Sequence, residues 1–479
     1  MKISKVIILH KSGSLTELDN YRGLSLINNF SKPLERHVAD TLVGFLNNNQ
    51  FFSPSQFGFR KGFSTVHNIL NLANLITEAL SRGTSCMSIF LDVRKCFDLI
   101  DRNKLFDKLY NYGIRGQALQ WFKSYYENRK QCVFFEGVVS MTLAILLGVL
   151  QGSVLGPILF VIYINDLVKC SVEVLLSLFA DDAVGFLEKN NIIDLINHAK
   201  NVVPKLIEWY SSNSLLVHPG KTKCLIFSSP RERLNVIEQD FKNRFEVYID
   251  LNNAGEQMND KITKLDLVTP ETGGFVKHLG ILLDGNLNYR YHLNNLHSKV
   301  SKIIYSMKIM KHLLDKKHLR LLYNSYIKSN IEYCCLLLTG CSDHLLSPIL
   351  KQQKLAVRII ENLPNNSHTA QYFKSNAILP LPLLIKFNCV RFMHKFKNGG
   401  QPEIFNDAWN LQGDRHNYRT RNRLNFAYVA GIDRNYLLRA PLHAMPTIFN
   451  NLPQNIREIE NEKEFKQKCF THFLNQIEF

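Results

Sequence analysis

Residues 175–186 read LLSLFADDAVGF and place two adjacent aspartates, Asp181 and Asp182, inside an otherwise apolar run. Burying one carboxylate costs free energy, and burying two neighbours costs more unless positive charge meets them. Two short apolar halves around a two-residue centre predict a β-hairpin with the aspartates at its tip. The stretch therefore predicts a buried sheet that carries two carboxylates at one edge.

A second apolar segment supplies a third carboxylate. Residues 86–93, CMSIFLDV, are typical of a buried strand, and Asp92 stands at its end. If this strand neighbours the hairpin, Asp92, Asp181 and Asp182 converge. Grouped carboxylates suit Mg²⁺, and two ions about 3.5–4 Å apart can clamp both oxygens of a phosphoryl transfer. Aspartate is common in turns, so the pair alone is a weak signal, but Asp92 makes a metal site the favoured interpretation.

Composition narrows the class of protein. The 479 residues carry a net charge of +17, with a hydrophobic fraction of 46% that is ordinary for a globular protein. The length predicts about three domains or subdomains. The basic excess favours a polyanionic partner, with a basic but inert surface as the alternative. Ten scattered cysteines without a CxxC pair indicate a reducing, intracellular compartment and no structural zinc.

One uncharged segment is long enough to span a bilayer. Residues 137–165 contain no charged side chain, but Gln151, Gly152, Ser153 and Pro157 interrupt their centre. We expect a strand over residues 141–149 and a helix over residues 153–167 with Ser153 as N-cap, both buried in a core. A membrane partner is therefore not expected, and a transmembrane segment is kept as the minor alternative.

The remaining pattern alternates helices with strands. Helices are expected over residues 64–83, 101–113, 116–129 and 192–213, the last kinked or divided by Pro204, and strands over residues 131–139, 223–229 and 276–284. Asp101 is the expected cap of the second helix. The fold class is α+β with an antiparallel sheet. Residues 228–274 show little pattern and are expected to be loops with one short hairpin.

The chain changes character after residue 285. Residues 286–331 are helical in pattern and contain a single acidic residue, Asp315. Their basic and apolar residues are interleaved: Lys299, Lys302, Lys308, Lys311, Lys316, Lys317, Arg320 and Lys328, with Ile303, Ile304, Met307, Leu313, Leu314, Leu322, Tyr323 and Tyr326. A solvated amphipathic helix and a surface that tracks a nucleic-acid backbone explain this equally well. Residues 348–479 are again helical in pattern.

Seven segments in one order resemble the reverse transcriptase of non-LTR, LINE-type retrotransposons, closest to the jockey-like elements. They are YRGLSLINNFSKPLER, QFGFRKGFSTVHNIL, FLDVRKCFDLID, GVLQGSVLGPILFVIYINDL, LFADDAVGF, NSLLVHPGKTKCLIF and VKHLGILLDGNL. The resemblance implies a right-hand polymerase fold: fingers and palm over residues 1–285, a thumb-like basic helical region over 286–347, and a C-terminal helical region over 348–479. It implies an RNA-directed DNA polymerase that adds dNTPs to a DNA primer on an RNA template during retrotransposition.

The resemblance also implies roles for single residues. Asp92, Asp181 and Asp182 match the metal-binding carboxylates for two Mg²⁺ ions, with Mn²⁺ as a substitute. Lys221 matches a lysine proposed to protonate pyrophosphate, although a simple loop lysine is nearly as good an interpretation. The substrate-binding matches are Lys11 and Arg22 for the triphosphate, Phe97 for the sugar, and Gln151 with Gly152 for the nucleotide and template. Phe97 keeps the alternative of an ordinary core phenylalanine.

Departures from the family pattern leave a second functional hypothesis open. Gly23 and Leu150 stand where proline is usual, and Cys96 stands where alanine is usual. Leu150 is expected to loosen the turn before Gln151, and Cys96 to crowd the sugar site. The chain starts inside the first fingers motif, so we expect a truncated reading frame without the upstream endonuclease. The alternative function is a catalytically impaired, nucleic-acid-binding remnant of a retrotransposon.

Overall fold

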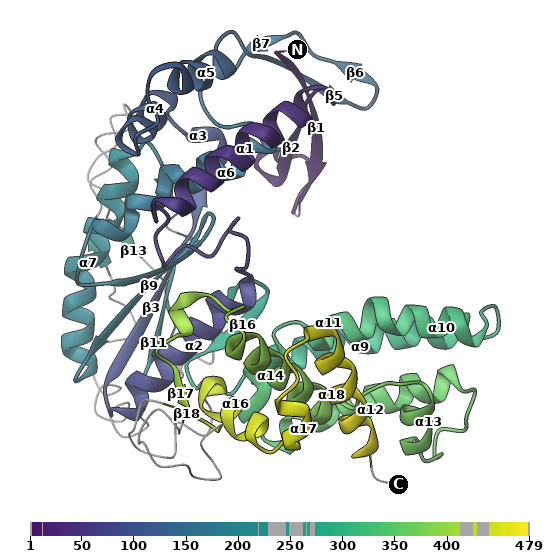
Figure 1. Ribbon diagram of the computed structural model, residues 1–479. Helices are drawn as coiled ribbons and strands as arrows, with labels where there is room; N and C mark the ends of the chain where they lie inside the picture. Colours follow the sequence, from purple (N-terminus) through teal and green to yellow (C-terminus); the bar gives the residue numbers. More distant parts are fainter. Residues whose placement is uncertain are drawn as a thin grey trace.

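The computed structural model describes residues 2–11, 13–218, 220–228, 246–248, 262–264, 266–268, 274–411, 425–428 and 440–477. These residues form a crescent with a sheet at its centre (Figure 1). A small N-terminal sheet and its helices lie at one end, and the C-terminal helices lie at the other. The two termini are therefore at opposite ends of the molecule.

The central sheet has the strand order β14-β11-β3-β9-β8. Its strands are β3 (Ser85–Leu91), β8 (Leu175–Phe179), β9 (Asp182–Lys189), β11 (Lys223–Phe227) and β14 (Asp266–Val268). The β11-β3, β3-β9 and β9-β8 pairs are antiparallel, while β11 and β14 are parallel. The predicted hairpin and its antiparallel setting are confirmed, and the strand that ends before Asp92 is its direct neighbour.

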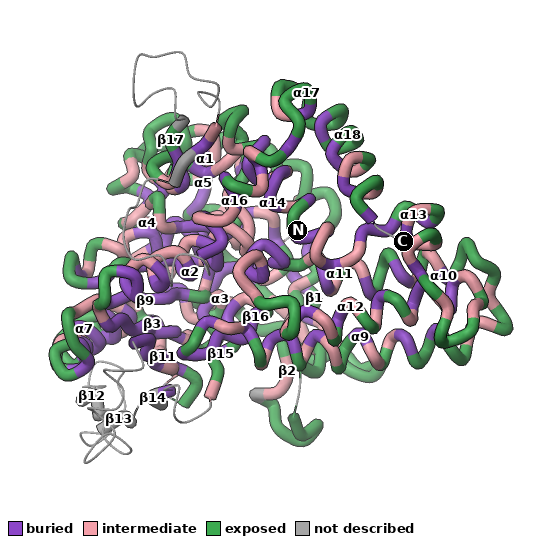
Figure 2. The backbone as a smooth tube through the Cα atoms, turned by 90° about the horizontal axis from the view of Figure 1, so that it is seen from below, coloured by how far each residue is buried: buried purple, intermediate pink, exposed green. Residues whose placement is uncertain are grey.

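Helices cover both faces of this sheet, which explains why β3 is apolar without alternation. Cys86 and Phe90 pack on one face with α2 (Thr65–Ser81) and the C-terminal helices. Met87, Ile89 and Leu91 pack on the other face with α6 (Leu155–Ile164) and α7 (Ile192–Ser212). Figure 2 shows β3, β9 and β11 as buried. The edge that carries the aspartates is thus held by two cores.

The N-terminal sheet has the order β2-β1-β5-β6, with β7 also paired to β5. Its strands are β1 (Ile3–His10), β2 (Tyr21–Leu26), β5 (Lys130–Phe135), β6 (Val138–Val139) and β7 (Leu143–Ala144). The helices beside it are α1 (Ser31–Asn48), α4 (Arg102–Asn111) and α5 (Gly116–Tyr126). The expected buried strand over residues 141–149 is wrong, because only β7 forms there and Leu143 and Leu146 are exposed at 66% and 79%. Apolar composition alone did not reveal that this segment lies at a sheet edge.

The remaining elements extend the crescent beyond the central sheet. They are the hairpin β15 (Phe275–His278) with β16 (Ile281–Asp284), and helices α9 (Arg290–Met310), α10 (Lys316–Leu322), α11 (Ser329–Glu332), α12 (Asp343–Ile360), α13 (Ala370–Ser375), α14 (Leu381–Lys397), α16 (Pro441–Asn450), α17 (Gln454–Arg457) and α18 (Glu462–Asn475). Strands β17 (Trp409–Leu411) and β18 (Phe426–Tyr428) pair with each other. One apolar core runs from α2 and the central sheet into these helices.

Local signals predicted most helix ends correctly. Asp101 accepts hydrogen bonds from the backbone N–H groups of Asn103 and Lys104 and caps α4 as expected. Ser153 is placed one residue before the cap position, which Val154 occupies, yet its hydroxyl accepts the Gly156 N–H at 2.8 Å. The division of α7 at Pro204 is wrong, because the helix is continuous and its buried apolar face holds both halves on the sheet.

Three further expectations concern residues 228–274, residues 286–331 and a membrane-spanning segment. Much of residues 228–274, where loops and a hairpin were expected, lies outside the described residues. The helical prediction for residues 286–331 is confirmed, but Leu313 and Tyr326 are 84% and 55% exposed and so are not part of a buried face. Among the described residues, no helix is long and apolar enough to cross a membrane.

A buried polar chain links α2 to two sheets. Asn68 donates to Ser177 Oγ at 2.9 Å, and its Oδ1 contacts His278 Nε2 at 3.0 Å. All three residues are at most 4% exposed. Burial lowers the pKa of His278 to about 4, so the native ring is neutral while the unfolded ring protonates near pH 6.5.

This burial predicts acid-dependent stability. Between pH 6.5 and 4 the unfolded state binds the extra proton, so His278 stabilisation is complete above pH 6.5 and is lost as pH falls towards 4. We expect it to contribute about 3 kcal/mol over that window. Denaturant unfolding at pH 7 and pH 4.5 should show a smaller loss for His278→Gln, which retains a donor for Asn68. An identical loss in variant and wild type would contradict this.

Candidate active site

The three aspartates occupy adjacent strand ends. Asp92 directly follows β3, Asp182 is the first residue of β9, and Asp181 lies in the turn between β8 and β9. The antiparallel register pairs Leu91 with Ala183, so Asp92 and Asp182 follow as neighbours at the same edge. Asp92 and Asp181 are half-buried, and Asp182 is exposed.

These carboxylates interact electrostatically. Desolvation, followed by the charges of Asp181 and Asp92, raises the pKa of Asp182 to about 6, while Lys11 acts in the opposite direction. Asp182 therefore lies within electrostatic range of Asp181, Asp92 and Lys11, which directly follows β1. Among the described residues, no group of three His, Cys, Asp or Glu side chains is already arranged around a single ion position.

The hairpin tip has an unusual backbone. Ala180, directly before Asp181, has φ of +54°, a left-handed conformation that a non-glycine residue adopts at a cost. Its backbone N–H donates to Gln56 Oε1 at 3.2 Å. On the other side, the Cys96 thiol donates to Asp181 Oδ2 at 3.5 Å and is buried at 4% exposure. Cys96 thus contacts a candidate ligand, a contact that the prediction of crowding at the sugar did not foresee.

Asp92 is held by the turn that contains Lys221. The Asp92 carbonyl accepts the His218 N–H at 2.7 Å, and its N–H donates to Thr222 Oγ1 at 3.3 Å. The Lys221 N–H in turn donates to the His218 carbonyl, and the Lys221 side chain is exposed. Lys221 is therefore connected to Asp92 through two backbone hydrogen bonds that share His218, and its side chain faces solvent.

Gln151, Gly152 and Arg22 come together although about 130 residues separate them. Arg22 Nε donates to Gln151 Oε1 at 3.4 Å, and Gln151 Nε2 donates to Asp98 Oδ1 at 2.8 Å. The Ser25 N–H donates to the Gln151 carbonyl at 2.9 Å. This chain of contacts attaches the N-terminal sheet to the turn before α6. In this turn the Leu150 carbonyl accepts both the N–H and the hydroxyl of Ser153.

Phe97 lies in the short helix α3 (Cys96–Leu99) and stacks on Phe160 of α6, with ring centroids 4.4 Å apart. It is half-buried, and it packs against the core while leaving part of its surface accessible. Both interpretations of Phe97 are compatible with this position.

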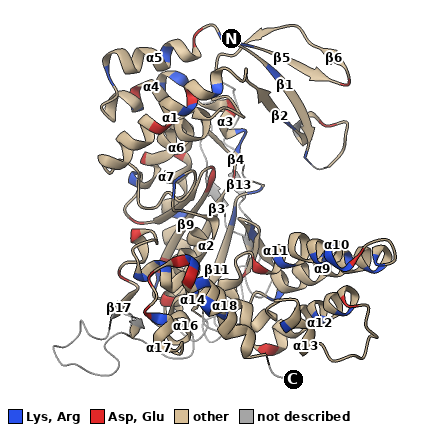
Figure 3. Ribbon diagram, turned by 45° about the vertical axis from the view of Figure 1, so that its right-hand side comes forward, with Lys and Arg blue, Asp and Glu red and all other residues tan. Residues whose placement is uncertain are grey.

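Basic side chains line the far arm of the crescent (Figure 3). Lys299, Lys302 and Lys308 are exposed on α9, and Lys317 is exposed on α10. Lys316 instead pairs with Glu361 at 2.7 Å. The basic face predicted from sequence is therefore confirmed as an exposed surface.

Comparison with known proteins assigns the chain to a family. Residues 9–258 match the family described as reverse transcriptase (RNA-dependent DNA polymerase). The chain belongs to this family. The resemblance to non-LTR elements is also confirmed: relatives include a probable RNA-directed DNA polymerase from transposon X-element of Drosophila melanogaster, 26% identical over 74% of this chain and 37% of the relative. The RNA-directed DNA polymerase from mobile element jockey of Drosophila funebris is 27% identical over 61% of this chain and 30% of the relative.

The chain spans about a third of the length of these curated relatives. Family membership implies the right-hand polymerase fold, and the mixture of helices with an antiparallel sheet agrees with it. Among solved structures, apo telomerase from Candida tropicalis is similar at a TM-score of 0.42, with 11% identity over 82% of this chain and 66% of that chain. The family assignment rests on the sequence match over residues 9–258.

Sequence reasoning missed several residues of this site. Gln56, Asp98, His218 and Thr222 all lie within quoted motifs, yet no role was assigned to them. Their partners are far away in the chain, so spacing could not reveal them. Membership of these motifs was a signal for all four residues, but it did not indicate which partner each one contacts.

Gly152 tests how tightly the turn is built. It has φ of +107°, and a Cβ there would lie 2.7 Å from the Ser25 carbonyl oxygen. We expect Gly152→Ala to lower the free energy of unfolding by about 1–3 kcal/mol. Gly137→Ala is the matched control, since Gly137 has φ of +85° but open space around it, and should cost roughly 1 kcal/mol. Equal losses in urea unfolding would show that contact with Ser25 is unimportant.

Proposed function

We propose that this chain is an RNA-directed DNA polymerase that adds dNTPs to a primer 3′-hydroxyl during retrotransposition. The observation that carries the proposal is the placement of Asp92, Asp181 and Asp182 at neighbouring ends of an antiparallel sheet in a reverse transcriptase family member. Similar relatives are named as RNA-directed DNA polymerases. In this assignment the central sheet is the palm, the N-terminal sheet belongs to the fingers, and α9 to α11 form the thumb.

The donor set fits divalent metal ions. The available groups are hard carboxylate oxygens, and the pKa of Asp182 is raised by burial and then by the charges of Asp181 and Asp92, which a cation would neutralise. Asp92 and Asp181 would hold two Mg²⁺ ions, with Mn²⁺ as a substitute, and Asp182 would orient the ion at the primer end. When bound, such ions lower the barrier to phosphoryl transfer by neutralising charge on the attacking and leaving oxygens.

The protein groups around the carboxylates would handle the incoming nucleotide. Lys11 and Arg22 approach from the N-terminal sheet and supply positive charge for the triphosphate. Gln151 is held by Arg22 and Asp98, and Gly152 allows close backbone approach to the nucleotide and template. Lys221 would supply a proton to the leaving pyrophosphate from its exposed position beside the Asp92 turn.

Two further surfaces complete the proposal. Phe97, supported from behind by Phe160, would exclude a 2′-hydroxyl from the sugar position. The exposed lysines of α9 and α10 would contact the phosphates of the RNA template and DNA primer duplex. Phosphate contact requires positive charge rather than base recognition, so this arm can serve any sequence.

Asp181→Asn tests the central claim. The amide keeps the shape of the side chain but removes the charge that would hold the ions, so incorporation of dTTP on poly(rA)/oligo(dT) with Mg²⁺ should fall by about 10³-fold or more. Binding of the duplex should persist, because the basic arm is unchanged. If folded wild-type protein binds the duplex but incorporates nothing with Mg²⁺ or Mn²⁺, the nucleic-acid-binding remnant is the better description.

Phe97→Val tests the assignment of the sugar gate. The smaller side chain opens space beside the ribose, so the preference for dNTP over rNTP, measured as the ratio of kcat/KM values, should drop by about 10-fold or more. Phe160→Leu is the control, since it changes the ring's support without changing the gate residue. Unchanged sugar selectivity in Phe97→Val would return Phe97 to the role of a core residue.

A further inference from the structure

We propose that Gln56 is a positioning residue that sets the backbone of the β8–β9 hairpin tip, so that Asp181 and Asp182 are presented towards Asp92. Its catalytic consequence rests on the proposed polymerase function, whereas its structural consequence rests on contacts alone. Gln56 lies 124 residues before Ala180 in the chain, and its side chain is uncharged. Its side-chain amide joins the two segments through the Ala180 N–H.

The side-chain oxygen of Gln56 accepts hydrogen bonds from two backbone N–H groups. Gln56 Oε1 accepts the Gly58 N–H at 2.7 Å and the Ala180 N–H at 3.2 Å. Gln56 itself is 0% exposed, so water cannot replace this acceptor. Because Ala180 is the left-handed residue directly before Asp181, the acceptor stabilises the conformation that directs both aspartates. Without it, the Ala180 N–H would be a buried donor in a strained turn.

The segment around Gln56 is fitted closely against the hairpin. The Leu178 N–H donates to the Ser55 carbonyl and the Phe57 N–H donates to the Leu178 carbonyl, both at 2.8 Å, which extends the sheet beyond β8. A Cβ on Gly58 would lie only 2.3 Å from the Ala180 nitrogen. Only glycine therefore permits this approach, and the segment and the tip must move together.

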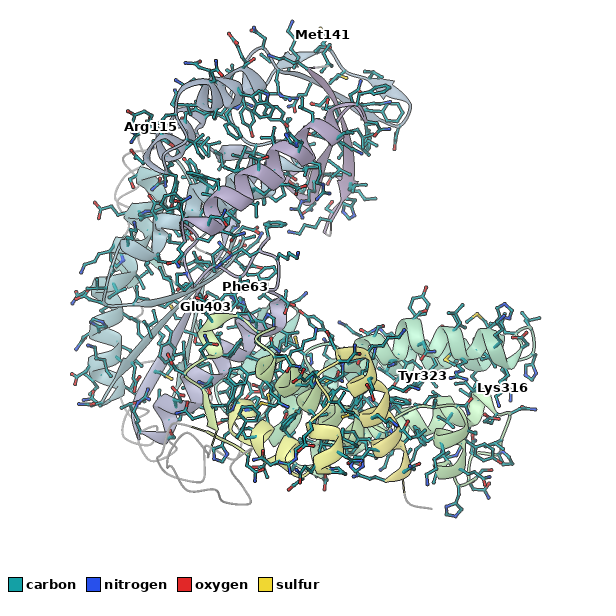
Figure 4. The ribbon with its side chains drawn as sticks, viewed as in Figure 1. Phe63, Arg115, Met141, Lys316, Tyr323 and Glu403 are labelled. Atoms are coloured by element: carbon teal, nitrogen blue, oxygen red, sulfur yellow. The ribbon has the colours of Figure 1, made fainter. Side chains whose placement is uncertain are left out.

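Arg60 braces the same segment. Its Nη1 donates to the Ser53 carbonyl at 2.9 Å and to the Gln56 carbonyl at 3.1 Å. Its guanidinium lies over the Phe63 ring, 4.2 Å from the centroid. Figure 4 shows Phe63 between the central sheet and the C-terminal helices, on the inner side of the crescent. The acceptor that faces Ala180 is thus fixed by a folded loop rather than by a flexible one.

The other half of the Gln56 amide distinguishes positioning from ordinary packing. Gln56 Nε2 is buried without a hydrogen-bond partner. An unpaired buried donor destabilises the fold, and an apolar side chain of equal length would avoid that cost. A glutamine at position 56 is therefore explained by the need for its side-chain oxygen as an acceptor next to Ala180. The amide as a whole does not explain it, because the unpaired Nε2 lowers the stability of the fold.

Gln353 provides a matched control. It is also 0% exposed, but its amide is fully used inside the C-terminal helices. Its Nε2 donates to Tyr323 Oη and the Leu379 carbonyl, and its Oε1 accepts the Leu381 N–H. Tyr323 lies among those helices in Figure 4, far from the hairpin. Gln353→Met removes three buried hydrogen bonds, against two for Gln56→Met, and does not touch Ala180.

The experiment compares Gln56→Met and Gln353→Met with wild-type protein in three measurements. Hydrogen exchange at the Ala180 amide should be at least about 10-fold faster in Gln56→Met alone. Mn²⁺ binding, followed by electron paramagnetic resonance, should weaken by about 10–100-fold in the same variant. In the polymerase assay its kcat should fall by about 10–100-fold with little change in the dNTP KM, while Gln353→Met keeps the wild-type kcat.

Two results would overturn the proposal: unchanged Ala180 exchange in folded Gln56→Met, or equal losses of Mn²⁺ affinity and kcat in both variants. If Gln56→Met does not fold, Gly58→Ala displaces the same tip from the same segment, because its Cβ would lie 2.3 Å from the Ala180 nitrogen, and should give the same exchange and Mn²⁺ changes. Inactive wild-type protein that still shows faster Ala180 exchange and weaker Mn²⁺ binding in Gln56→Met would refute the polymerase function while supporting the positioning role.

Discussion

Mutual repulsion among three carboxylates at one sheet edge is the constraint on which this structure depends. Asp92, Asp181 and Asp182 are brought together by the pairing of β3 with β9, and burial together with the charges of Asp181 and Asp92 raises the pKa of Asp182. A flexible edge would relieve the repulsion by moving apart. The sheet resists because β3 is buried on both faces and belongs to two apolar cores.

Long-range polar contacts complete what the sheet begins. Arg22 and Gln151 connect the N-terminal sheet to the turn before α6, and His218 and Thr222 hold the backbone of Asp92. Gln56 does the same for the tip that carries Asp181. The contacts of His218, Thr222 and Gln56 fix backbone rather than carboxylate oxygens, and Asp181 Oδ2 accepts only the weak thiol donor of Cys96 among the contacts described above, so these oxygens stay available to cations. A site built for charged substrates needs that division of labour, because ligands held by the protein's own donors would be less available to metal ions.

Sequence patterns predicted elements well where a local signal decided the outcome. The hairpin around Asp181, the strand before Asp92 and the helix capped by Asp101 all follow from periodicity and capping chemistry. The strand expected over residues 141–149 failed because apolar composition does not say whether a neighbour covers it. Pro204 failed to divide α7 because packing of the helix on the sheet outweighed a local preference. The candidate metal ligands were thus predictable, whereas the residues that hold them were not.

The sequence by itself determined the chemical character of this protein: three aspartates at the ends of apolar runs, a basic arm after residue 285, and ordered motifs that identify the reverse transcriptase family. These are local or compositional properties, and they can be recognised without knowing any tertiary contact. Only the tertiary structure decided that Gln56 faces Ala180, that Cys96 reaches Asp181, and that Lys11 influences Asp182. The reason is physical: hydrogen bonds and charges act over a few ångströms in space. The spacing of residues along the chain does not show which distant segments lie that close together.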